Sequence, residues 1–168
     1  MTTTTEPVIK YLDQQYYAAI HAKVEMNEIA AVVPGLLNEV FAWLAVHDVQ
    51  PWGALIKYNA FYCDGHLELE AGVITAAAVT GDGRVCAGIF PAGNYAMLTH
   101  MGHYSGLKDA TAFLEGWIEK KGLHSDETQT ENSVTFTSRV EFYPTDPATE
   151  PDPDKWQTDI VFLLKDEE

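Results

Sequence analysis

Apolar residues recur along the chain with either a helical or a strand-like spacing. The first segment with a clear pattern has the helical spacing. From Ile29 to Leu44 apolar residues recur at steps of three and four, the spacing of one helix face. Pro34 lies within this run and cannot donate to a helix ladder. We therefore expect the helix proper to begin with Pro34 in its first turn and to end near His47 and Asp48.

A second helical period follows in the other half of the chain. Its apolar positions run from Leu107 to Ile118, and Ser105 is the expected N-cap. Lys120, Lys121 and Gly122 are typical of a helix end. The sequence thus predicts two amphipathic helices, one in each half.

The remaining apolar segments are strand-like and are separated by turns such as Asp64-Gly65 and by polar loops. The expected strands are Val8–Val24 (with bends), Trp52–Phe61, Leu67–Val79, Val85–Phe90, Tyr95–His100, Thr135–Tyr143 and Thr158–Leu164.

This order of elements is a repeat of strand, helix and two strands. We predict an α+β fold in which two βαββ units form one antiparallel sheet, with both helices packed on one face and a groove between them. The expected domain is the whole chain, 1–168, with halves 8–80 and 81–168 and a disordered N-terminus over about residues 1–7.

Charge narrows the classes of partner. Ten Lys and Arg stand against 25 Asp and Glu, a formal charge of −15. This balance argues against direct binding of nucleic acid, which requires a basic surface. We expect no membrane segment, since no run approaches about 20 consecutive apolar residues. The chain shows no secretory signal, so a cytoplasmic location is expected. Cys63 and Cys86 are interpreted as buried small hydrophobes.

Several short motifs, in this order and spacing, resemble the gyrase-inhibitor-like (GyrI-like) family of effector-binding domains, found alone or attached to bacterial transcription regulators. They are Trp43-Leu44 through Val49-Gln50-Pro51-Trp52-Gly53 to Tyr58, then Pro91-Ala92-Gly93-Asn94-Tyr95-Ala96, His100-Met101-Gly102-His103-Tyr104, Gly116-Trp117-Ile118, Arg139-Val140-Glu141-Phe142-Tyr143-Pro144 and Trp156-Gln157-Thr158-Asp159-Ile160.

The resemblance implies a doubled βαββ fold whose central groove binds hydrophobic, often cationic, small molecules. Some stand-alone members resemble hydrolases that open reactive cyclopropane-containing natural products. The chain departs from the family at Asn94, where a basic residue is usual, and at His103, where proline is usual. We expect no DNA-binding segment before the fold, and therefore an effector-binding domain that stands alone.

Glu141 is the leading site candidate. On a strand Glu141 and Tyr143 point to one side and Val140 and Phe142 to the other. A partly desolvated carboxylate would be a cation anchor or a general base. The pattern alone equally allows a solvent-facing glutamate, and the family resemblance favours the pocket acid.

The other candidates for ligand contact are aromatic or histidine side chains, each of which has core packing as its alternative: Tyr58, Tyr143, Trp43, Trp117, Tyr104, Trp52 and His100. His100 and His103 lack the further ligands of a metal site, so neither metal nor cofactor is expected.

Three functions follow from these observations. The first is binding of a hydrophobic, cationic molecule in an aromatic groove with Glu141, in a sensing, sequestration or resistance role. The second is a hydrolase in which Glu141 activates water and Tyr58 assists. The third is an acidic inhibitor of a DNA-handling protein, which would require a protein partner. A homodimer through a strand edge also stays open.

Overall fold

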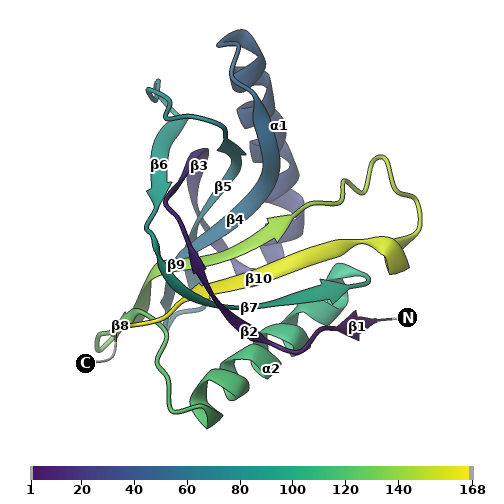
Figure 1. Ribbon diagram of the computed structural model, residues 1–168. Helices are drawn as coiled ribbons and strands as arrows, with labels where there is room; N and C mark the ends of the chain where they lie inside the picture. The colour runs from purple at the N-terminus through teal and green to yellow at the C-terminus, as the bar shows by residue number, and fades with distance from the viewer. Residues whose placement is uncertain (1, 167–168) are drawn as a thin grey trace.

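A single antiparallel sheet carries the fold, and two helices cover one of its faces (Figure 1). The computed structural model describes residues 2–166, within which ten strands lie in this sheet. The strands are β1 (Thr3–Thr4), β2 (Val8–Leu12), β3 (Gln15–Glu25), β4 (Pro51–Tyr62), β5 (His66–Thr75), β6 (Cys86–Phe90), β7 (Gly93–Met101), β8 (Glu127–Gln129), β9 (Ser133–Tyr143) and β10 (Gln157–Leu163). The helices are α1 (Ile29–Val46) and α2 (Leu107–Lys120), with the 3-10 turns η1 (Met26–Glu28), η2 (Tyr104–Gly106) and η3 (Pro153–Lys155).

The sheet order confirms the predicted duplication. The central strands run β7-β10-β9-β4-β5-β3, so β7-α2-β9-β10 and β3-α1-β4-β5 are two like units joined along β9 and β4. Strands β1 and β2 pair with β7, β8 pairs with β9, and β6 pairs with β3. The fold class expected from the hydrophobic pattern is therefore the one observed.

The register places the C-terminal part of β9 between the two helix-covered cores. Glu141 lies opposite Ile56 of β4 on one side and Ile160 of β10 on the other. Residues directly opposite on antiparallel strands point to the same face. Ile56 belongs to the core under α1, with Val33, and Ile160 to the core under α2, with Leu114. The Glu141 side chain therefore points to the helix-covered face, at the seam between the two halves.

Helix α1 differs from the expectation at its start. It begins at Ile29, directly after η1, and runs through Pro34. The prediction that the helix proper begins with Pro34 is wrong. Pro34 removes the bond to the carbonyl of Ala30, and both residues are exposed, so water can satisfy that carbonyl.

The helical segment Met26–Val46 is long and apolar enough to cross a membrane, with a mean hydropathy of 1.8. A helix that packs on the core of a folded domain can meet the same criterion. The expectation of no such segment from runs of consecutive apolar residues missed this helix. In the structure α1 turns Val33, Val40 and Leu44 into the core over β3, β4 and β5.

Several smaller expectations change as well. The Val8–Val24 segment forms two strands, and Thr3–Thr4, within the N-terminus expected to be disordered, pairs with β7. Ser105 is not the cap of the second helix, because it lies inside η2 and its N–H donates to Nδ1 of His103 (3.1 Å). Both cysteines are exposed rather than buried.

Candidate functional site

Glu141 is the centre of a small hydrogen-bonded group on the seam. It lies on β9, is only 8% exposed, and accepts two phenol hydrogen bonds on the same oxygen. Tyr58 Oη donates to Glu141 Oε1 at 2.8 Å, and Tyr143 Oη donates to it at 2.6 Å. Among residues 2–166 no hydrogen bond reaches Oε2. We call Glu141, Tyr58 and Tyr143 the carboxylate cluster.

The two phenols of the carboxylate cluster are fixed as donors. Burial, and then the negative charge of Glu141, raise the pKa of Tyr58 well above its usual value of 10, and the same two causes raise the pKa of Tyr143. Both therefore keep their protons at neutral pH and can only donate to the carboxylate. This arrangement holds Glu141 in one orientation and leaves Oε2 as its available acceptor.

Aromatic rings continue from the carboxylate cluster toward η2. The Tyr104 ring lies edge-on to Tyr143, with centroids 5.8 Å apart, and Trp156 lies 5.0 Å from Tyr104. His103 stacks on Trp156 at 5.5 Å. Trp156 was not among the predicted contact residues, and its position in one of the family-like motifs was the signal that could have found it.

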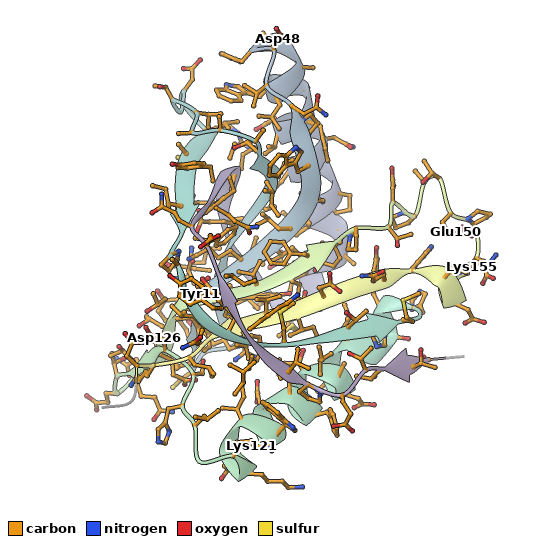
Figure 2. The ribbon with its side chains drawn as sticks, viewed as in Figure 1. Tyr11, Asp48, Lys121, Asp126, Glu150 and Lys155 are labelled. Atoms are coloured by element: carbon orange, nitrogen blue, oxygen red, sulfur yellow. The ribbon has the colours of Figure 1, made fainter. Side chains whose placement is uncertain are left out.

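Phe61 lies between the carboxylate cluster and an open cleft, which the three cluster residues themselves do not line. The Phe61 ring lies edge-on to Tyr58, with centroids 5.8 Å apart, and Phe61 also lines a cleft of about 860 Å³ between the C-terminal part of α2 and strands β8 and β9. We call this space the Arg139 cleft, because the Arg139 side chain, 11% exposed, lines it together with Phe136 and Phe162. Figure 2 labels Lys121 and Asp126, between which the chain passes from α2 toward β8 along this cleft.

An irregularity in β9 brings Phe136 beside Arg139. Tyr58 of β4 lies opposite Arg139 and Ala60 lies opposite Thr135, so a single β4 residue faces three residues of β9. Such a bulge breaks the strict alternation of side chains and re-aims the residues within it. Phe136 therefore reaches the face that carries Arg139 and Glu141.

The structure separates the remaining predicted residues from the carboxylate cluster. Trp43 packs on the core under α1 and stacks on His47 (4.0 Å), and Trp117 packs on the core under α2. Trp52 is 64% exposed at the start of β4, and His100 is fully buried, with Nε2 3.2 Å from the His103 carbonyl oxygen. Both helix tryptophans are thus partly buried against the cores, and Tyr58, Tyr143 and Tyr104 are the predicted residues that lie around Glu141.

Among residues 2–166, no three His, Cys, Asp or Glu side chains are grouped so that they could hold a metal ion. The chemistry of the site comes from a carboxylate, phenols and aromatic faces.

Comparison with known proteins assigns the family. The sequence profile of the GyrI-like small-molecule-binding domain matches residues 5–165. This chain belongs to the GyrI-like family. The match takes in both βαββ units and every residue of the carboxylate cluster, so the resemblance seen in the motifs is confirmed.

Solved structures share this GyrI-like fold at low sequence identity. The EcmrR C-terminal domain has a TM-score of 0.73 at 16% identity, covering 96% of this chain and 98% of that domain. SAV2435 bound to tetraphenylphosphonium has a TM-score of 0.60 at 12% identity, covering 96% and 94%. A hydrolase from Listeria innocua has a TM-score of 0.59 at 15% identity, covering 95% and 92%.

The GyrI-like chain spans 58% of the EcmrR chain in its complex with DNA. A search of curated proteins finds no match to the chain.

Proposed function

We propose that this GyrI-like protein binds a hydrophobic small molecule whose cationic or proton-donating group pairs with Glu141. The single observation that carries the proposal is the carboxylate cluster, in which a buried acid is held by two phenols on Oε1 and keeps Oε2 available. Binding sites of this kind combine apolar walls with a few oriented polar groups.

The aromatic surroundings favour a cation at this acid. Aromatic faces attract cations by about 0.5–2 kcal/mol each, most strongly in desolvated sites. Tyr104 lies edge-on to Tyr143 of the carboxylate cluster, and Trp156 lies beside Tyr104. The similar protein SAV2435 was solved with tetraphenylphosphonium, a hydrophobic cation. These observations support a role in sensing, sequestration of, or resistance to such compounds.

A thermal-shift titration with tetraphenylphosphonium tests the proposal. At about 100 times its dissociation constant a ligand adds about 2.7 kcal/mol to the free energy of unfolding. We expect a shift in the wild type that Glu141→Gln loses. Glu131→Gln, which removes the same charge from an exposed position, is the control and should keep the shift. An equal shift in wild type and Glu141→Gln would contradict the assignment of Glu141.

Hydrolysis is the second candidate, favoured by the same free oxygen. Glu141 Oε2 can accept a proton from an attacking water while Tyr58 and Tyr143 hold Oε1. A similar fold belongs to a hydrolase from Listeria innocua. Incubation with cyclopropane-containing electrophiles, followed by mass spectrometry for the water adduct, tests this function. A hydrolase would form the adduct in the wild type and not in Glu141→Gln, whereas binding without any adduct would leave only the first function.

A further inference from the structure

Arg139 is a buried cation at the edge of an open space. Its side chain is 11% exposed, and it lines the Arg139 cleft. Within residues 2–166 its side chain donates one hydrogen bond, from Nη2 to Glu115 Oε1 at 2.6 Å. No guanidinium nitrogen is among the enclosed side-chain atoms that lack a partner in that part of the chain, and Arg139 is one of the residues that line the cleft. A guanidinium has five N–H donors, and the bond to Glu115 uses one of them.

The aromatic rings around Arg139 already hold a cation. The guanidinium carbon lies 4.3 Å from the ring centroid of Phe162, 4.7 Å from that of Phe136 and 5.2 Å from that of Phe61. These faces would otherwise attract a cationic ligand. Because Arg139 occupies them, a cationic group entering the cleft would meet a like charge.

We propose that the Arg139 cleft is a binding subsite for a carboxylate on the ligand, whose apolar body extends toward Glu141. The proposal rests on the proposed small-molecule binding and adds a second charged group to the ligand. The planar guanidinium fork matches a carboxylate with two parallel N–H···O bonds. Arg139 and Glu141 are two residues apart on β9 and share one face, about 7 Å apart along the strand, a separation that one small molecule can span.

Glu115 is the group that such a ligand would replace. It reaches Arg139 from α2, and its side chain is 51% exposed. A ligand carboxylate can therefore take over the guanidinium while Glu115 turns to water, and no charge is left buried and unpaired. Glu115 competes with the ligand for the same donors.

The rim of the Arg139 cleft excludes polyanions. Glu119 and Glu127 line it alongside Glu115, and Lys165 is the other strong cation there. These acids would repel a phosphate chain or a nucleic acid, which carry several negative charges. A ligand with one carboxylate on an apolar body carries a single negative charge, which pairs with the guanidinium and is repelled less. The favoured class is a hydrophobic amphoteric molecule, with a cationic or proton-donating end and a single carboxylate.

A matched pair of dyes tests the subsite. A rhodamine with a free carboxylate and its ethyl ester share one cationic ring system and differ only in the anionic group. By fluorescence anisotropy we expect the wild type to bind the free acid about tenfold tighter than the ester, the size of one good charge-assisted contact. Arg139→Gln should bring the two affinities together, and Glu141→Gln should weaken both dyes alike.

Glu115→Gln and Glu119→Gln keep the test decisive if Arg139→Gln does not fold. Each removes one negative charge from α2 at the cleft, but only Glu115 is bonded to Arg139. Glu115→Gln should strengthen binding of the free acid more than Glu119→Gln does, with equal effects on the ester. If both dyes bind through Glu141 but the ratio of their affinities is the same in these variants as in the wild type, the carboxylate subsite is wrong and the proposed function stands. If neither dye binds the wild type, both proposals fail.

Discussion

At the scale of single residues, two phenols donate hydrogen bonds to one oxygen of Glu141, and this constrains both the tyrosines and the carboxylate. Tyr58 and Tyr143 are committed to the carboxylate and cannot ionise readily. The carboxylate cannot rotate, so a ligand meets an oriented acceptor without ordering it first.

The protonation of these tyrosines predicts how stability depends on pH. An unfolded tyrosine loses its proton near pH 10, whereas burial and the charge of Glu141 raise the pKa of Tyr58 and Tyr143 well above that in the folded protein. Their contribution is therefore complete below about pH 9 and is lost as pH rises above 10. There the free energy of unfolding should fall by about 1.4 kcal/mol per pH unit for each tyrosine.

Urea unfolding between about pH 9 and 11 measures this slope. Tyr58→Phe or Tyr143→Phe should reduce the slope of the unfolding free energy against pH by the contribution of one tyrosine. Tyr11→Phe, at a 63% exposed position on β2, should leave the slope unchanged. Equal slopes in all four proteins would show that the cluster tyrosines ionise normally.

Sequence reasoning found part of this site for a definable reason. A strand has a side-chain period of two, and that period places Glu141 and Tyr143 together. The same period puts Arg139 on their face, so the pattern contained a signal for Arg139 that the prediction did not use. The partners of Arg139 were out of reach, because Phe136 arrives through a bulge and Glu115 comes from α2.

At the scale of elements, α1 is a long helix with two weak residues on its outer side. Pro34 and Gly35 are both exposed in its second turn, and a Cβ added at Gly35 would meet nothing within 4 Å. The sequence suggested that a helix should not pass through Pro34. Packing of the residues on either side against the sheet overrides that local preference.

Strengthening α1 should therefore stabilise the protein. Gly35→Ala is expected to raise the free energy of unfolding by about 0.5–1 kcal/mol, and Pro34→Ala by about 1–3 kcal/mol, since the latter also restores the bond to the Ala30 carbonyl. Chemical denaturation at neutral pH measures both. Gly65→Ala, at a φ of 93° in the β4–β5 turn, is the contrasting control and should destabilise. A loss of stability in Gly35→Ala would mean that this face of α1 is not free.

At the scale of the whole molecule, the doubled fold was predictable because it depends on repeated patterns. Each half carries its own helical stripe and its own strands, and the sheet order follows from pairing them antiparallel. The open cleft was not predictable. Its volume arises where α2 ends and β8 is inserted before β9, and no local pattern reports that spacing.

The formal charge of −15 acts on the molecule as a whole. Like charges repel one another more strongly in the compact state than in the unfolded chain. Salt screens this repulsion, because the Debye length falls from about 30 Å at 0.01 M to about 10 Å at 0.1 M. We expect the melting temperature to rise between these two sodium chloride concentrations. A neutral osmolyte at equal osmolality is the control, and a flat or falling melting temperature would show that ion pairs outweigh the repulsion.

The bulge in β9 also limits how the family can change by insertion and deletion. Losing one residue between Phe136 and Arg139 would leave two β9 residues opposite Asn59 of β4, a smaller bulge with Phe136 and Arg139 still on one face. Losing two would restore a regular ladder and keep Glu141 facing the helices, but would remove the residues that carry Phe136 to Arg139. Relatives that differ by two residues at this point should therefore keep the acid and bind different ligands, so the length of this strand would record divergence in ligand choice.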